Sequence, residues 1–227
     1  MEANKQFLII GNVNAITYKE VFPLLKDNKA WLGVSITSGD RKFNVPDSYP
    51  LNAAGCGIDE DGKKFIRVKG VRWFTNLDHG RRHQPLTLMT MADNLKFSKH
   101  NDIKENGYQH YDNYDAIEIP YTDAIPSDYD GLMGVPITFL DKYCPEQFEI
   151  IGETQRGCHD EKLELKKYDD YWEVTQSGVK TGSSGSKTNG NPNLAINDGK
   201  HNYFINADGL IVQSCYQRIL IRRKAAN

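Results

Sequence analysis

The chain has 227 residues, of which 39% are hydrophobic and 26% charged, and its formal net charge is −2 at pH 7. This length and composition allow one large domain or two small ones with a buried core. The near-neutral charge excludes a basic surface over the whole chain, so any binding to nucleic acid or membrane would rest on local patches.

Targeting and redox signals are absent from the sequence. The first apolar run, Phe7 to Ile10, is too short for a signal-peptide core or a membrane span. The four cysteines, Cys56, Cys144, Cys158 and Cys215, form no C-x-x-C pair, so no thiolate zinc site is predicted. We therefore expect a cytoplasmic protein with reduced thiols and no bound metal.

The first predicted element is a strand over 6–11 (QFLIIG), because its continuous apolar run is typical of a parallel-sheet strand buried on both faces. A helix follows from the spacing of the apolar residues, with Asn14 or Thr17 as its cap and a bend or break at Pro23. The apolar positions of this helix are Ile16, Val21, Leu24 and Leu25. A second strand over 30–36 (AWLGVSI) completes a βαβ-like unit.

The middle of the chain is less regular. Residues 38–64 are rich in turn-forming residues and predict a long excursion or loose hairpin, and 65–78 (FIRVKGVRWFTNLD) has strand character. The pattern over 86–113 is weak and polar. A short strand within 111–120 ends at Pro120, and 128–152 predicts two strands with a short helix opened by Pro145 between them.

The last third combines a polar stretch with two further strand signals. Residues 177–193 (SGVKTGSSGSKTNGNPN) predict a flexible or disordered loop. Residues 203–213 predict a hairpin with Asp208 and Gly209 at the turn, and 216–224 (YQRILIRRK) predict a final strand with a basic end.

Five stretches, in this order, resemble the C-terminal half of the EcoRI-type adenine-specific DNA methyltransferases. They are FLIIGNVNAITYKEVFPLLKDNKAWLGV, WFTNLDHGRRH, YDNYDAIEI, DYDGLMGVPITFLDKYCPEQFEIIG and RILIRRK. They cover most of the chain, and the region from about Cys158 to Gly209 matches least. The resemblance implies methyl transfer from S-adenosylmethionine to N6 of an adenine in double-stranded DNA, with the target base flipped out of the helix.

The resemblance also implies an α/β fold. Residues 1–85 would be the C-terminal portion of a class I Rossmann-like methyltransferase core. Residues 86–227 would be a mixed, mostly β target-recognition segment that contains the flexible loop 177–193. The family belongs to restriction-modification systems, which makes double-stranded DNA the expected partner.

One departure from the family is an absence. The catalytic tetrapeptide Asn-Pro-Pro-Phe does not occur in the sequence, and neither does the Gly-containing cofactor loop. In the family both precede the FLII strand, so the chain is expected to be cut just before the fifth strand of the sheet. We therefore expect no tight S-adenosylmethionine binding without an N-terminal half, and an exposed apolar edge that favours dimerisation.

Candidate pocket residues follow the two strongest N-terminal strand signals. Asn12 and Asn14 come just after the first strand, where open α/β sheets bind ligands, although Asn is also a common helix cap. Trp73 and Phe74 lie on opposite faces of a strand, so one could stack on a flipped base while the other packs in the core. We favour Phe74 for the base. Asn76 could hydrogen-bond a base edge, as could Asp78, which could equally end the strand in a turn.

Two basic clusters are candidates for phosphate contacts, which position a duplex without identifying its sequence. The first is Arg81, Arg82 and His83, which follow Gly80. The second is the closing run of Arg218, Arg222, Arg223 and Lys224, although charged chain ends are also common on solvated surfaces.

Three interpretations remain open at this point. The chain is part of an enzyme that requires a partner half or a homodimer, a DNA-binding remnant without catalysis, or an inert truncated fragment. A neighbouring reading frame that ends in Asn-Pro-Pro-Phe would favour the first.

Overall fold

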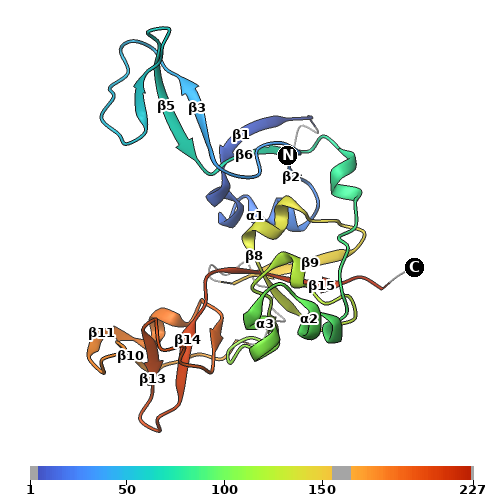
Figure 1. The fold of residues 1–227 in the computed structure, drawn as a ribbon, viewed down its shortest axis with the longest axis vertical. Helices are drawn as coiled ribbons and strands as arrows, with labels where there is room; N and C mark the ends of the chain where they lie inside the picture. Colours follow the sequence, from blue (N-terminus) through green and yellow to red (C-terminus); the bar gives the residue numbers. More distant parts are fainter. Residues whose placement is uncertain (1–4, 155–164, 226–227) are drawn as a thin grey trace. The chain divides into compact units, whose positions relative to one another are not determined.

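The computed structural model describes residues 5–154 and 165–225, so the expectations that concern Cys158 lie outside the described residues. The chain divides into two compact units, 1–81 and 82–227, which are described separately below. The fold is mixed α/β, with mostly strands and a few short helices (Figure 1).

The first unit contains a three-stranded sheet in the order β1-β6-β2, built from β1 (Leu8–Asn12), β6 (Val71–Thr75) and β2 (Trp31–Leu32). Both outer strands run antiparallel to β6, and therefore run parallel to each other. The expectation of a strand buried on both faces is wrong for β1, because Leu8, Ile9 and Ile10 are 54%, 56% and 44% exposed. The expected exposed apolar edge is confirmed, since β1 ends the sheet order.

A 3-10 helix, η1 (Val13–Thr17), and a short helix, α1 (Phe22–Lys26), lie between β1 and β2 in the chain. Pro23 falls in the first turn of α1, where its missing N–H is not needed, so the helical pattern is interrupted as expected. Ile16, Phe22 and Leu25 are buried. The βαβ expectation needs correction, because β6 is inserted between the two parallel strands.

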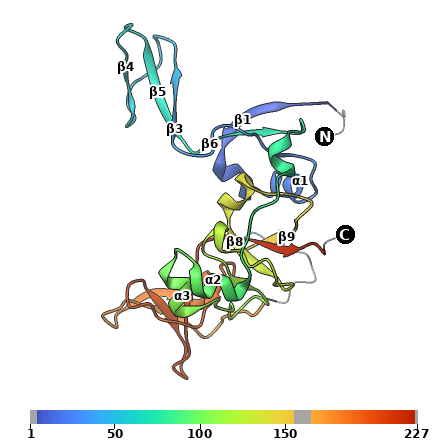
Figure 2. The same ribbon diagram turned by 45° about the vertical axis from the view of Figure 1, so that its right-hand side comes forward.

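Instead of the long excursion or loose hairpin expected over residues 38–64, the first unit contains a second three-stranded antiparallel sheet in the order β3-β5-β4. Its strands are β3 (Asp40–Asn44), β4 (Cys56–Ile58) and β5 (Lys64–Lys69), which Figures 1 and 2 show as a distinct group. Gly70 separates β5 from β6 and has a φ of +69°, a backbone conformation that favours glycine. The strand expected over 65–78 is therefore divided into two strands that belong to different sheets.

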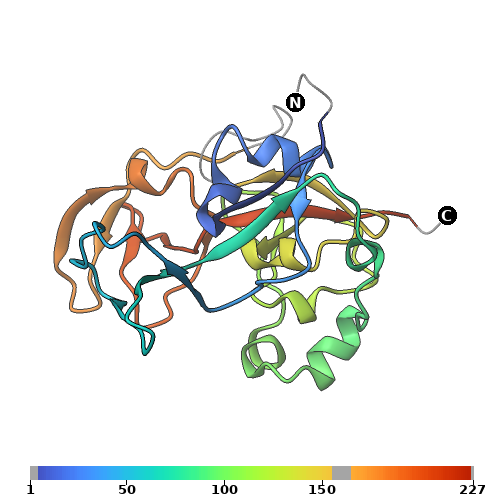
Figure 3. The ribbon, with the colours of Figure 1, turned by 90° about the horizontal axis from the view of Figure 1, so that it is seen from above.

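The second unit is built around a four-stranded sheet in the order β7-β8-β15-β9. The strands are β7 (Ile117–Glu118), β8 (Met133–Pro136), β9 (Phe148–Glu153) and β15 (Arg218–Arg223). The final strand β15, red in Figure 3, pairs with both β8 and β9, and its residues 219–221 are almost fully buried. The predicted closing strand is confirmed and is central to this sheet.

Short helices precede or connect these strands. They are α2 (Met91–Phe97), α3 (Asn101–Asn106), η3 (Thr122–Ala124) and η4 (Ile137–Asp141). The helix expected at Pro145 is wrong: the helical turn lies earlier, in η4, and Pro145 lies in a turn. In α2, Thr90 caps the first turn by accepting a hydrogen bond from the Asp93 N–H at 3.1 Å.

The remaining strands form a five-stranded antiparallel sheet in the order β11-β10-β13-β14-β12. They are β10 (Trp172–Val174), β11 (Lys180–Ser184), β12 (Asn193–Leu194), β13 (Tyr203–Ile205) and β14 (Ile211–Ser214), with η5 (Gly185–Thr188) between β11 and β12. One face packs on Tyr168 and Tyr171. The hairpin turn at Asp208 and Gly209 is confirmed.

The flexible loop expected over 177–193 is wrong. Its first part pairs with β10 in a hairpin whose turn contains Gly178, at a φ of +84°. Its second part buries Thr188 and Asn193, whose side chains hydrogen-bond each other at 2.7 Å. Backbone pairing and buried polar contacts therefore order a segment that is poor in apolar residues and whose Val179 is 60% exposed.

Candidate functional site

Asn12 and Asn14 lie where β1 passes into η1. The Asn12 side chain accepts a hydrogen bond from the Asn14 N–H at 2.9 Å and donates one to the Lys69 carbonyl at 3.2 Å. Asn12 is thus the N-cap of η1 and also ties this turn to the end of β5. Both residues are exposed. The contacts of Asn12 are those of a helix cap.

Trp73 and Phe74 lie on opposite faces of β6, as strand alternation requires. Phe74 is only 9% exposed, and its ring covers Gly11, where a Cβ atom would lie 2.9 Å from Phe74 Cε2. Trp73 is half-buried and packs on Gly33. Of the two rings, Trp73 is the more accessible one, whereas our expectation favoured Phe74 for contact with a base.

Asn76, which follows β6, hydrogen-bonds the backbone just before β1. Asn76 accepts a hydrogen bond from the Phe7 N–H at 2.8 Å and donates one to the Lys5 carbonyl at 3.0 Å. These bonds extend the β1–β6 pairing. They engage both the oxygen and the nitrogen of the Asn76 side-chain amide. Asp78 is exposed.

Two basic side chains of the same stretch contact the backbone around β2. His79 Nε2 lies 3.0 Å from the Leu32 carbonyl, which makes this nitrogen a donor, and Arg81 Nη1 donates to the Val34 carbonyl at 2.9 Å. Sequence reasoning did not single out His79. The contact was not predictable, because it depends on where β2 ends.

His83, in the last position of η2 (Gly80–His83), belongs to the second unit. Its Nδ1 lies 2.7 Å from Glu146 Oε1, and the Cys144 thiol donates to Glu146 Oε2 at 3.2 Å. Burial raises the pKa of Glu146, but the hydrogen bonds from His83 and Cys144 outweigh it and lower that pKa below its ordinary value. Glu146 therefore remains an anion that orients the imidazole.

Gln147 connects the segment that follows His83 to Lys224, just after β15, within the second unit. Its side chain accepts a hydrogen bond from the Leu86 N–H at 2.8 Å and donates one to the Leu86 carbonyl at 3.0 Å, while its own carbonyl accepts from the Lys224 N–H. A cavity of about 410 Å³ lies here. We call it the basic groove, and it is lined by Pro85, Ser127, Glu146, Gln147, Arg223, Lys224 and Ala225.

The remaining basic candidates differ in their surroundings. Arg82 is half-buried, Arg222 is exposed, and Arg223 Nε lies 3.8 Å from Asp130. Arg223 and Lys224 line the basic groove, and His83 reaches it through Glu146. Among the described lining residues, Arg223 and Lys224 supply the cationic side chains of the groove, beside the Glu146 carboxylate, and such cations suit phosphate contacts.

Arg218 has a different role from the phosphate contact we expected. Its guanidinium pairs with Glu118 across β15 and β7, with Nη2 at 2.5 Å and Nε at 3.0 Å from Oε1. The two side chains are 12% and 8% exposed. Tyr111 also donates a hydrogen bond to Glu118. A buried Arg218 that is held in this way is not available for a phosphate group.

The part of the chain that the structure describes contains no group of three or more His, Cys, Asp or Glu side chains placed to hold a metal ion. None of the helices in that part is both long and apolar enough to cross a membrane. Cys56, Cys144 and Cys215 are free thiols.

Comparison with known proteins identifies relatives among type II methyltransferases. The family model described as adenine-specific methyltransferase EcoRI matches residues 1–224. The chain is 44% identical over 173 residues to the type II methyltransferase M.EcoRI of Escherichia coli, which covers 75% of this chain and 49% of the relative. It is 38% identical over 153 residues to M.MgeORF184P of Mycoplasma genitalium, covering 66% and 45%. No solved structure matches the chain.

These matches have two consequences. The chain spans about half the length of the curated relatives it matches, so their whole activity does not transfer automatically. The family model, however, covers nearly all of the chain, in agreement with the resemblance of the five sequence stretches. The chain therefore belongs to the EcoRI family of adenine-specific methyltransferases.

Proposed function

We propose that this chain is the C-terminal part of an S-adenosylmethionine-dependent DNA adenine N6-methyltransferase of a restriction-modification system. In this proposal it requires an N-terminal half in trans, which supplies the cofactor loop and the Asn-Pro-Pro-Phe turn. Residues 1–85 are the end of the catalytic core, and 86–227 form the target-recognition segment. The membership of the family and the half-length match to its relatives support this assignment.

The exposed strand β1 is the observation that carries the proposal. Its three apolar side chains lie on both faces of the strand and are all about half exposed, and one edge of the strand has no partner among the described residues. Such an edge is a template for pairing with another strand. Parallel β1 and β2, with the antiparallel β6 between them, also suit the end of a Rossmann-like sheet, because such sheets often carry an antiparallel strand.

The residues of this chain do not by themselves fit the cofactor. The side-chain amides of Asn12 and Asn76 are occupied by hydrogen bonds that stabilise the sheet. A cavity of the first unit lies on the β3-β5-β4 sheet, where Tyr49, Ile66 and Lys69 contribute to its lining, and not at the ends of β1 and β6. We therefore assign cofactor binding to the N-terminal half.

DNA contacts are the role that we assign to this chain. In the proposal, His83, Arg223 and Lys224 at the basic groove contact phosphates, with Arg81, Arg82 and Arg222 as further cations. Trp73, Asn14 and Asp78 approach the target adenine once the N-terminal half is present. Phosphate contacts of this kind account for most non-specific affinity and weaken with salt.

The basic groove also favours a second candidate function, a DNA-binding remnant without catalysis. Calorimetry with S-adenosylmethionine separates the two. We expect no micromolar binding by the chain alone, and stoichiometric binding after addition of the N-terminal half of the Escherichia coli relative. The Ile9→Lys variant of this chain should abolish S-adenosylmethionine binding by the mixture. Binding by the isolated chain, or a mixture that still fails to bind, would overturn the split-enzyme proposal.

A further inference from the structure

Asparagine followed by glycine is a dipeptide in which the backbone readily attacks the side chain. The glycine nitrogen attacks the side-chain carbonyl carbon of the asparagine, because glycine has no Cβ atom to hinder the approach and leaves the backbone free to rotate. The sequence contains two such pairs, Asn106-Gly107 and Asn189-Gly190. The two pairs have the same local chemistry, so the folded structure decides which of them reacts.

The structure restrains the backbone at Asn106. This residue is exposed and is the last residue of α3, and the Gly107 N–H donates to the Ile103 carbonyl at 3.0 Å. Attack by the Gly107 nitrogen requires that this hydrogen bond breaks first. A hydrogen bond of typical net strength lowers the reactive population about fivefold. Asn106 is therefore protected in spite of its exposure.

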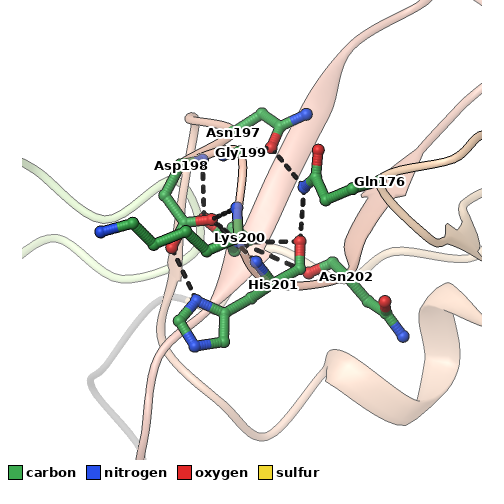
Figure 4. Close-up of polar contacts among 8 residues, drawn as sticks. Gln176, Asn197, Asp198, Gly199, Lys200, His201 and Asn202 are labelled. Atoms are coloured by element: carbon green, nitrogen blue, oxygen red, sulfur yellow. Dashed lines mark hydrogen bonds and ion pairs between the residues drawn. The ribbon is translucent and has the colours of Figure 1, made fainter.

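The Asp-Gly pairs of the chain show similar protection. In the loop of Figure 4, the Gly199 N–H that follows Asp198 donates to Asn197 Oδ1 at 3.0 Å. The N–H groups of two further glycines in such pairs donate to carbonyls of their own turns, and these glycines are Gly62 and Gly209. At neutral pH a carboxylate also reacts with a nitrogen far more slowly than an amide does. The Asp-Gly pairs are therefore weaker candidates than the Asn-Gly pairs.

The backbone at Asn189 has no restraint of this kind. Asn189 follows η5 in a half-buried turn, with φ at −62° and ψ at −18°. Among the described residues, the Gly190 N–H has no hydrogen-bond acceptor. Rotation about ψ of Asn189 brings the Gly190 nitrogen toward the side chain without breaking a hydrogen bond of its N–H. The nucleophile is thus more available here than at Asn106.

The side chain of Asn189 is held by a hydrogen bond that favours the attack. Its Oδ1 accepts from the Tyr168 N–H at 2.6 Å. This bond draws electrons from the carbonyl carbon. It also stabilises the negative charge that develops on Oδ1 when the nitrogen attacks, as the donors of an oxyanion hole do. Asn189 therefore combines an available nucleophile with an activated carbonyl group.

We propose that Asn189 is the site of spontaneous deamidation in the folded chain. The Gly190 nitrogen loses its proton to solvent hydroxide and forms a bond to Asn189 Cγ. The Cγ–Nδ2 bond breaks, and the amine takes a proton from water and leaves as ammonia. Water then opens the cyclic succinimide at either carbonyl, which yields aspartate or isoaspartate. The reaction consumes only water and releases only ammonia.

The isoaspartate product disturbs buried contacts around β12. It adds a backbone carbon at a position that the hydrogen bond from the Asn191 N–H to the Thr188 carbonyl spans, at 3.1 Å. Thr188 and Asn193 are 1% and 0% exposed and hydrogen-bond each other. The Asn193 carbonyl accepts from the Asp112 N–H at 2.7 Å, which links β12 to the segment before β7. We expect isoaspartate to weaken this link, whereas aspartate keeps the backbone length and preserves it.

Peptide mapping by mass spectrometry tests the site. The full chain is incubated at mildly alkaline pH, both folded and in concentrated urea, and the conversion of amide to carboxyl is followed at the two pairs. In the folded chain we expect Asn189 to react about fivefold faster than Asn106, or more, because of the hydrogen bond that protects Asn106. In urea the two rates should become equal. Equal rates in the folded chain, or an Asn189 that stays intact while the urea sample reacts, would overturn the proposal.

Matched variants assign the mass change to one residue. Asn189→Gln should abolish it in the peptide that contains this position, because the longer side chain closes a ring slowly. Asn106→Gln, the control, should leave the rate at Asn189 unchanged. A mass change that persists in the Asn189→Gln protein would place the reaction at another amide of the peptide and overturn the assignment.

Hydrogen exchange tests the structural consequence. The isoaspartate and aspartate forms are separated by chromatography, and the Asp112 amide should exchange at least about fivefold faster in the isoaspartate form. The Asn189→Asp variant, which has the charge without the longer backbone, should exchange as the parent does. Unchanged exchange in the isoaspartate form would overturn the predicted loss of the β12 link. None of these measurements requires DNA, S-adenosylmethionine or an N-terminal half, so they do not depend on the proposed function.

Discussion

Arg218 forms a buried ion pair with Glu118, so its role in this molecule is structural. Both side chains are at least 88% buried, and Tyr111 adds a third polar group. Burial lowers the pKa of Arg218, but the hydrogen bond and charge of Glu118 outweigh it and raise that pKa above its ordinary value. A buried pair of this kind adds little net stability, but loss of one partner leaves a buried charge uncompensated.

Replacement of one member should therefore be strongly destabilising. We expect Glu118→Gln to lower the free energy of unfolding by about 3–5 kcal/mol, measured by urea denaturation. The double variant Glu118→Gln, Arg218→Met should recover much of that loss. Arg222→Gln, on an exposed side chain of the same strand, should change stability by less than about 0.5 kcal/mol. A Glu118→Gln protein within 1 kcal/mol of the parent would contradict the structural role of Arg218.

We expect the Asp123 carboxylate to contribute to the loss of folding stability at acidic pH. Burial raises the pKa of Asp123, but hydrogen bonds from Lys99 and His100 outweigh it and lower that pKa to about 2 from the ordinary value of 3.8. A carboxyl with a lowered folded pKa stabilises the protein above its unfolded pKa, and this stability is lost as the pH falls toward about 2. Because the side chain is 45% exposed, solvent screening makes the effect modest.

In the Asp123→Asn variant, the free energy of unfolding should depend less steeply on pH in the acidic range. Stability measured from pH 5 to pH 2 should fall less steeply than in the parent, with the difference concentrated below pH 4. Asp169→Asn serves as the control, because this exposed carboxylate forms no ion pair within the described residues. An unchanged slope for Asp123→Asn would show that the contacts with Lys99 and His100 do not persist in solution.

At the scale of elements, Gly70 separates two sheets of the first unit. Its φ is +69°, and a Cβ atom there would lie 3.0 Å from Val13 Cγ1. We expect Gly70→Ala to destabilise the protein by about 1–3 kcal/mol through backbone strain and this contact. Gly62→Ala is the matched control: its φ is +77°, but its Cβ would meet nothing within 4 Å. Thermal unfolding that gave equal losses for the two variants would contradict the contact with Val13.

Strands with a strong apolar or turn signal could be predicted from the sequence. Residues 203–213 form a hairpin because Gly209 fits the turn, and β15 is buried because its apolar residues are continuous. The same reasoning failed for β1, since a continuous apolar run usually indicates burial, but here the strand ends a sheet. α2 and α3 could not be predicted, because each buries a single side chain, Asn94 and Ile103 respectively, and shows no apolar period.

The candidate site was predictable only in part. The sequence identifies both basic clusters, but the groove lined by Arg223 and Lys224 depends on Gln147, which contacts Leu86 from 61 positions away. The burial of Arg218 depends on Glu118, 100 positions away. Contacts of this range have no local sequence signal. The order of residues 177–193 was missed for the same reason, since β11 is held by backbone pairing and not by apolar side chains.

At the scale of the whole molecule, family membership and length together define the central question. The chain belongs to a methyltransferase family but spans about half the length of its curated relatives, and it lacks the Asn-Pro-Pro-Phe tetrapeptide. The strand β1 offers an apolar edge that a neighbouring strand would cover. A homodimer formed through this edge would cover it too, but would not supply the cofactor loop. In the proposed split enzyme, catalysis requires a partner that carries that loop.

The most direct test is transfer of a labelled methyl group from S-adenosylmethionine to duplex DNA by this chain mixed with the N-terminal half of the Escherichia coli relative. The account predicts N6-methyladenine in the product with the mixture, none with either half alone, and at least a tenfold loss when the chain carries Ile9→Lys. Methylation by the chain alone, or none by a mixture in which the two halves form a stable complex, would contradict it.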